Sequence, residues 1–160
     1  MIGCMGSPSD TDAHLRTARV DDLPELLRLA REFYDEDGFT TSDDDLDRNF
    51  RALFGAETSA HICLAVRDGS AIGFALTTTD LILESGLVAE LQDLYVMPAH
   101  RGSGVGARLM DESQQWAKQR GAALLEIVVA PNGQDVSRLF DYYATKGFRD
   151  EGRRLLTLEL

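Results

Sequence analysis

The stretch "PAHRGSGVGARLM", from Pro98 to Met110, is the most informative part of the sequence about the fold and about a possible ligand. Three of its residues are glycines, Gly102, Gly104 and Gly106, and they lie between an apolar strand-like run and a helix-like run. Glycine adopts positive φ angles and lets backbone N–H groups approach a ligand closely. A helix that begins here would direct its free N–H groups and the positive end of its dipole at an anion. The stretch therefore predicts a phosphate-binding loop between a strand and a helix.

Two nucleotide-binding patterns have glycines at comparable spacing. The pattern G-x-x-x-x-G-K-[ST] fails, because no Lys-Ser or Lys-Thr pair follows the glycines. The dinucleotide pattern G-x-G-x-x-A matches at Gly102, Gly104 and Ala107, and Glu126 follows about 20 residues later. However, Glu126 lies inside the next expected strand rather than at its carboxyl end, and Met97 to Arg101 separates the preceding strand from the glycines. A dinucleotide site is therefore rejected.

The flanking sequence predicts a mixed sheet with helices on its faces, an α/β (α+β) fold. Apolar spacing predicts helices over Leu23–Tyr34, 42–54 and 104–120, and a last helix marked by Val136, Leu139, Phe140 and Tyr143. "RDGS" (67–70) predicts a two-residue turn between two strands. Further strands are expected over 15–20, 87–97, 123–129 and 153–159.

The loop resembles that of the GNAT family of N-acetyltransferases. The family pattern [RQ]-x-x-G-x-[GA] is matched in full by Arg101 to Gly106, and the strand "LQDLYVMP" and the segment "YYATKGF" add to the likeness. The resemblance implies a central sheet of about six to seven strands with about four helices and a splayed central strand pair. It implies a single acetyltransferase domain over 15–160, and the N-terminal sequence before it predicts a disordered leader over 1–14.

The same resemblance implies acetyl-CoA as the cofactor and assigns residues to it. Backbone N–H groups of the loop would cradle the pyrophosphate, and the backbone of the preceding strand would bind the pantetheine and the thioester, with an N–H near Val96 as the oxyanion donor. Asn132 would also contact the coenzyme or the acceptor, whereas the family position seven residues before the catalytic Tyr, often Asn, here holds Val136. The expected cofactor-binding residues are Leu94, Tyr95, Val96, Arg101, Gly102, Ser103, Gly104, Val105, Gly106 and Asn132.

Acetyl transfer to an amine requires a base, because an alkylamine with a pKa of about 10.4 arrives mostly charged. Glu90 and Asp93 are the candidates on the central strand, and strict alternation would place them on opposite faces. Asp93 lies in "DLYV", which resembles the matching segment of aminoglycoside 3-N-acetyltransferases. Diamine acetyltransferases also resemble this strand, but they have Glu where this chain has Gln92.

The family's proton donor to the leaving thiolate is a Tyr four residues before a Gly-Phe pair. Here that Tyr is Tyr143, before Gly147 and Phe148, with Tyr142 as the alternative. The catalytic residues expected from the sequence are therefore Tyr143, Asp93 and Glu90.

The charge of the chain bears on the class of acceptor molecule to be expected. The net charge is −11, with 27 acidic against 16 basic residues, which argues against nucleic acid and suits a small cationic amine. Eight acids and no base lie between Glu32 and Asp47. The family resemblance implies that this segment borders the acceptor cleft, and the expected acceptor-binding residues are Asp35, Glu36, Asp37, Asp43 and Asp93. The likeness to aminoglycoside 3-N-acetyltransferases makes an aminoglycoside the favoured acceptor. A polyamine, thialysine or protein amine, or a CoA-binding sensor without turnover, are the alternatives.

Other features bear on location and partners. No apolar run approaches the ~20 residues of a membrane span, and the N-terminus lacks the features of a signal peptide, so no membrane partner is expected. The two cysteines, Cys4 and Cys63, form no disulfide framework, which favours the cytoplasm. The histidines His14, His61 and His100 are isolated, so no metal site is expected. Family members are often dimers, which makes a homodimer the expected assembly if there is one.

Overall fold

The computed structural model describes residues 13–130 and 135–159. The chain divides into two compact units, Met1–Ile127 and Val128–Leu160. Asn132 and most of the expected leader lie outside the described residues.

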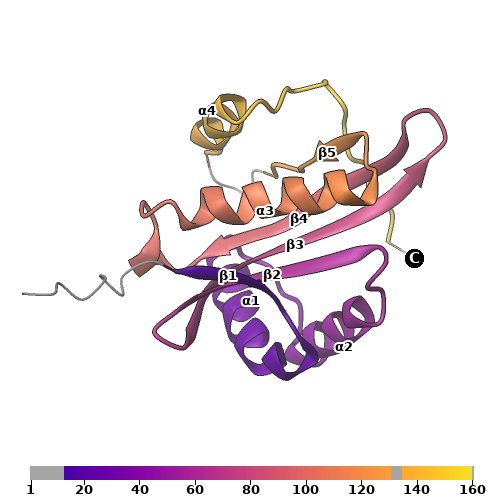
Figure 1. The fold of residues 1–160 in the computed structure, drawn as a ribbon. Helices are drawn as coiled ribbons and strands as arrows, with labels where there is room; N and C mark the ends of the chain where they lie inside the picture. Colours follow the sequence, from indigo (N-terminus) through magenta and orange to yellow (C-terminus); the bar gives the residue numbers. More distant parts are fainter. Residues whose placement is uncertain (1–12, 131–134, 160) are drawn as a thin grey trace, which may run out of the picture. The chain divides into compact units, whose positions relative to one another are not determined.

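The first unit contains a five-stranded sheet in the order β1-β2-β3-β4-β5 (Figure 1). The strands are β1 (His14–Thr17), β2 (Ala60–Arg67), β3 (Ser70–Ile82), β4 (Gly86–Val96) and β5 (Leu124–Glu126). The first three pairings are antiparallel, and β4 pairs with β5 in parallel. The turn predicted at "RDGS" is confirmed, with Asp68 and Gly69 both at positive φ, at 51° and 77°.

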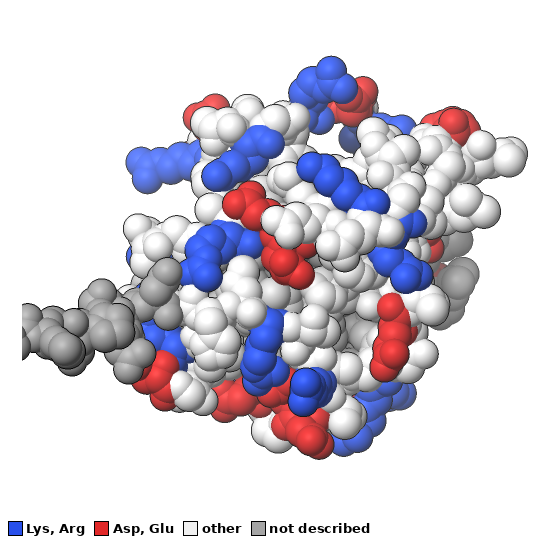
Figure 2. Space-filling view, in the orientation of Figure 1, with Lys and Arg blue, Asp and Glu red and all other residues white. Residues whose placement is uncertain are grey.

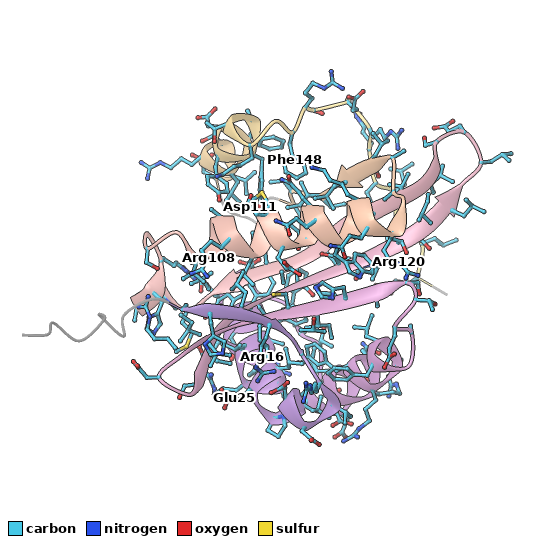
Figure 3. All side chains as sticks on the ribbon, viewed as in Figure 1. Arg16, Glu25, Arg108, Asp111, Arg120 and Phe148 are labelled. Carbon is cyan, nitrogen blue, oxygen red and sulfur yellow. The ribbon has the colours of Figure 1, made fainter. Side chains whose placement is uncertain are left out.

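Helices cover both faces of this sheet (Figure 1). α1 (Leu23–Asp37) and α2 (Asp43–Phe54) pack on one face, where Leu26, Leu29 and Phe50 join Leu64 and Phe74 in the main core. α3 (Val105–Arg120) covers the other face, with Val105, Leu109 and Met110 buried against the sheet. Figure 3 shows Arg108 and Arg120 near opposite ends of α3, and Glu25 on the α1 side.

Short elements and caps set where the helices begin. The 3-10 turns η1 (Val20–Asp22) and η2 (Pro98–His100) lead toward α1 and toward the glycine loop. Ser42 caps α2, because its hydroxyl accepts a hydrogen bond from the Asp45 amide at 3.2 Å. Gly38, at φ 78°, ends α1, so the helix runs three residues beyond the predicted Tyr34.

The second unit contains α4 (Ser137–Thr145), which confirms the predicted last helix.

Two expectations about strands differ from the structure. The strand expected over 123–129 is limited to β5, and residues 153–159 form no strand, so the described residues contain five strands rather than about six to seven. Among the described residues, no helix is long and apolar enough to cross a membrane.

Candidate active site

A β-bulge in β4 corrects the predicted faces of Glu90 and Asp93. Across the β3–β4 ladder, Leu76 lies opposite Asp93 but Thr77 lies opposite Leu91, so Gln92 is an extra residue. Glu90 therefore faces Thr78, on the same side of the sheet as Leu76 and Asp93. Strict alternation failed because one inserted residue inverts the pattern. The bulge brings both candidate bases to the face covered by α1 and α2.

Asp93 occupies a partly buried position beneath α1. The Tyr34 hydroxyl donates a hydrogen bond to Asp93 Oδ2 at 3.4 Å, at the long end of the range for such a bond. The pKa of Asp93 is raised to about 6, because burial, the largest cause, and the negative charges of Asp37 and Glu90 together outweigh the opposing hydrogen bond from Tyr34. Burial and the Asp93 charge raise the pKa of Tyr34 to about 12, so the phenol stays protonated and remains the donor.

Further carboxylates surround this position. Burial raises the pKa of Glu90, and the charges of Asp80 and Glu126 raise it further. Glu126 is the β5 partner of Glu90, and Asp80 is two residues beyond Thr78 on β3. Burial and then Glu36 raise the pKa of Asp37 at the end of α1. Asp37 and Glu90 thus place negative charge near Asp93, and Asp80 and Glu126 place negative charge near Glu90.

The acidic stretch from Glu32 to Asp47 is largely paired, in contrast to its appearance in the sequence. Six of its eight acids form ion pairs with arginines, which are Glu32–Arg28, Asp35–Arg31, Glu36–Arg101, Asp43–Arg31, Asp45–Arg48 and Asp47–Arg51. Figure 2 shows acidic and basic atoms side by side over the region of α1 and α2 on the visible face. Arginines before or after the stretch supply the cations that its own sequence lacks. The stretch is thus a weaker cation attractor than its composition suggests.

β4 presents an open edge beyond the bulge. Its register with β5 covers Val88, Ala89 and Glu90, and in the described structure β4 continues to Val96 without a β5 partner. The Met97 amide donates a hydrogen bond to Ile72 O at 2.9 Å, so Met97 directs its backbone groups toward β3. In an antiparallel pair, residues whose backbone groups point toward the partner strand alternate with residues whose groups point away. By that alternation the backbone groups of Leu94 and Val96 point away from β3, whereas those of Tyr95 face Phe74. Leu94 and Val96 therefore offer strand-type hydrogen bonds to an extended ligand such as pantetheine.

The glycine loop that follows fits an anion. Gly102 and Gly104 adopt φ angles of 76° and 85°, which side-chain-bearing residues rarely adopt. Gly104 is the N-cap of α3 and provides no side-chain cap, and the first turn of α3 contains no acid. The N–H groups of Val105 and Gly106 thus lack intrahelical acceptors at the positive end of a long helix. This arrangement suits the pyrophosphate of a coenzyme.

Side chains of the loop are held by the protein itself. Arg101 Nε donates to Val96 O at 2.8 Å, and both terminal nitrogens of Arg101 donate to the two carboxylate oxygens of Glu36 at 2.7 Å. The Ser103 hydroxyl donates to His100 O at 2.6 Å. The sequence suggested neither the Glu36–Arg101 pair nor the Tyr34–Asp93 contact, because both join residues about 60 positions apart.

Tyr143 belongs to the second unit. Its ring makes edge contacts with Tyr142 and Phe148, with centroids 5.3 and 5.6 Å apart, and burial raises the pKa of its phenol. The Phe148 amide donates a hydrogen bond to Tyr143 O at 3.1 Å, which connects the Gly-Phe pair to α4. The assignment of Tyr143 as proton donor stays a prediction.

Comparison with known proteins decides the family. The model of the "Acetyltransferase (GNAT) family" matches residues 23–148 of the chain. The chain belongs to this family. As a GNAT protein it is an acetyl-CoA-dependent N-acetyltransferase, which confirms the cofactor expected from the glycine loop.

Three curated relatives are similar to this chain, and two of them are named for an acceptor. An uncharacterized N-acetyltransferase of Archaeoglobus fulgidus is 32% identical over 139 residues, covering 84% of this chain and 92% of the relative. A thialysine N-epsilon-acetyltransferase of Bos taurus is 26% identical, covering 85% of this chain and 84% of the relative. An aminoglycoside N(6′)-acetyltransferase type 1 of Klebsiella aerogenes is 38% identical, over 41% of this chain and 45% of the relative.

Solved structures agree on the fold. An integron cassette protein from the mobile metagenome of Cole Harbour Salt Marsh has a TM-score of 0.79 at 31% identity, covering 91% of this chain and 90% of that one. An aminoglycoside N-acetyltransferase in complex with CoA has a TM-score of 0.80 at 20% identity, covering 99% of both chains. At that identity the second likeness concerns the fold alone.

Proposed function

We propose that this GNAT enzyme acetylates a primary amine of a small polycationic acceptor, and that an aminoglycoside is the favoured acceptor class. The observation that carries the proposal is Asp93, a partly buried carboxylate with a pKa of about 6, held by Tyr34 on the face that it shares with Glu90. A base of this pKa is better matched to neutral pH than an ordinary carboxylate.

The proposed proton path starts at the acceptor ammonium. Asp93 takes its proton, directly or through one water, and the Tyr34 phenol keeps the carboxylate oriented. The freed amine forms the N–C bond as the C–S bond of the thioester breaks, and the second proton of the amine nitrogen leaves to water as the neutral amide forms. Tyr143 then gives a proton to the departing thiolate, and the backbone N–H of Val96 donates a hydrogen bond to the carbonyl oxygen.

A polycation suits the charges around Asp93. Asp37, Asp80, Glu90 and Glu126 all lie close enough to alter the pKa of Asp93 or of Glu90. An acceptor with several ammonium groups would neutralise more of this charge than a monoamine. The Glu32–Asp47 stretch, in contrast, contributes mainly through Asp37, because arginines pair with most of its other acids.

Two kinds of observation support the aminoglycoside class. The "DLYV" strand resembles that of 3-N-acetyltransferases, and a curated relative is an aminoglycoside N(6′)-acetyltransferase. The alternative acceptor is a thialysine-like or polyamine substrate, which is favoured by the longer alignment with the thialysine enzyme.

The test is thiol release from acetyl-CoA with gentamicin-type and kanamycin-type aminoglycosides, spermidine, thialysine and lysine-bearing peptides as acceptors. Turnover with an aminoglycoside supports the proposal, and the acetylated position separates the 3-N from the 6′-N class. Turnover only with thialysine or spermidine would replace the acceptor. CoA binding without turnover on any acceptor would favour the sensor alternative.

A further inference from the structure

The last turn of α1 carries negatively charged side chains at the C-terminus of the helix, which is the negative end of its dipole. Asp35, Glu36 and Asp37 end α1, and no basic residue lies in that turn. Carboxylates near a helix C-terminus are disfavoured by the helix dipole, so helix stability gives no reason for Glu36 at this position. Its role is to be sought outside α1.

Glu36 makes its contact with the glycine loop, 65 residues later in the chain. Its two carboxylate oxygens each accept a hydrogen bond of 2.7 Å from Arg101, in the two-pronged geometry that fixes an arginine most firmly. The third nitrogen, Arg101 Nε, donates to Val96 O at 2.8 Å. Every nitrogen of the guanidinium is therefore engaged by the protein.

A second contact one turn earlier strengthens this connection. The Arg101 guanidinium lies over the Tyr95 ring, 5.5 Å from its centroid. The Tyr95 hydroxyl donates to Glu32 Oε2 at 3.4 Å, and its ring stacks on Phe33 with centroids 5.4 Å apart. α1 thus binds the end of β4 and the residues that follow it through two carboxylates one helical turn apart. Glu32 accepts from Tyr95, and Glu36 accepts from Arg101.

Arg101 stands between the two parts of the expected coenzyme site. Its side chain fixes the carbonyl of Val96, on the open edge of β4, and its backbone leads directly into Gly102. Displacing the guanidinium would free both the strand end and the start of the loop.

We propose that Glu36 is a positioning residue for the coenzyme: it holds Arg101 so that the guanidinium fixes Val96 and the entry to the glycine loop, and the Arg101 side chain does not itself bind a phosphate. This assignment concerns the donor site and is independent of the acceptor. It also removes Glu36 from the set of carboxylates available to a cationic acceptor.

The direction in which Glu36→Gln changes the affinity for CoA tests this proposal. CoA binding is measured by titration calorimetry on Glu36→Gln, Arg101→Gln and the double variant, with Glu57→Gln as a control that removes one exposed charge elsewhere. If Glu36 positions Arg101, Glu36→Gln weakens CoA binding by about two- to five-fold, the range that a half-exposed ion pair supports. Arg101→Gln weakens binding similarly, and the double variant is no weaker than the weaker single one. The KM for acetyl-CoA rises by the same factor, while kcat at saturating acetyl-CoA changes less than about two-fold.

Other results would overturn the proposal. If Arg101 binds phosphate and Glu36 competes for it, Glu36→Gln tightens CoA binding while Arg101→Gln weakens it. A CoA affinity equal to that of Glu57→Gln would remove any role in binding. A lower Tm with unchanged CoA affinity would show that the Glu36–Arg101 pair stabilises the fold without a role in CoA binding. Glu36→Asp, which keeps the charge but has a shorter side chain, is a second variant for the same comparison.

Discussion

The Tyr34 hydroxyl on α1 donates a hydrogen bond to Asp93 Oδ2 on β4, 3.4 Å away. This contact joins the helix of the acidic segment to the strand that leads into the glycine loop. It also opposes the effect of burial on Asp93, because a donor to the charged form lowers the pKa of a carboxyl group.

Tyr34→Phe is expected to raise the pKa of Asp93, since the opposing hydrogen bond is lost and burial remains. A base must be deprotonated to act, so activity falls as pH drops through its pKa. The acid limb of the kcat/KM profile should therefore move to higher pH than in the wild type. A limb that stays in place or moves to lower pH would show that Tyr34 does not act on this base.

Asp93→Asn is expected to stabilise the fold at alkaline pH. The folded pKa of about 6 exceeds the ordinary value of 3.8, so the carboxylate costs stability above pH 6 and the cost disappears as pH falls toward 4. The variant should gain between about 1 and 3 kcal/mol in free energy of unfolding at pH 8, and this gain should vanish near pH 4. Denaturant unfolding at both pH values measures it, with Asp111→Asn, an exposed carboxylate on α3, as the control. An equal gain at both pH values would contradict the assigned pKa shift.

Tyr143→Phe is expected to lower kcat by about 10²-fold if the phenol protonates the leaving thiolate. The ring contacts with Tyr142 and Phe148 remain available to Phe, so the Tm should change little. Tyr142→Phe is the matched control. A larger loss in Tyr142→Phe than in Tyr143→Phe would exchange the two assignments.

Gly104→Ala is expected to destabilise the protein by about 1 kcal/mol or more and to weaken CoA binding, because φ is 85° at this position. Gly106→Ala is the contrasting variant. Its added Cβ would make an ordinary contact of 3.7 Å with Val96 Cγ2, and alanine favours the helix by about 0.5–1 kcal/mol. Thermal melts and CoA titration should separate the two; equal behaviour would show that backbone conformation at Gly104 is not what the loop requires.

Local patterns predicted most of the first unit. The glycine loop, the "RDGS" turn and the helices α1 to α3 depend on residues adjacent in the chain, and each was found within a few residues of its expected bounds. The bulge at Gln92 could not be predicted, because one extra residue leaves no signature in hydrophobic spacing. It decided the geometry of the site, since it moved Glu90 to the side of Asp93.

Charge was the second point at which sequence reasoning failed. The segment from Glu32 to Asp47 contains no base, yet Arg28, Arg31, Arg48, Arg51 and Arg101 neutralise most of it. The first four each have a partner one helical turn away on the same helix, so i,i+3 and i,i+4 spacing could have indicated those pairs. The pair between Arg31 and Asp43 joins α1 to α2, so this spacing could not have indicated it. Arg101 could not be found in this way, because only the tertiary fold brings it to Glu36.

The role of Asp93 as the base is tested most directly by the pH dependence of kcat/KM between about pH 5 and 9, the working range of a general base with a shifted pKa. The wild type and Asp93→Asn are compared with the best acceptor from the thiol-release panel. We expect an acid limb near pH 6 in the wild type, and a loss of about 10²-fold or more in the variant with that limb absent. A variant within about two-fold of the wild type, with the same limb, would show that another group deprotonates the amine.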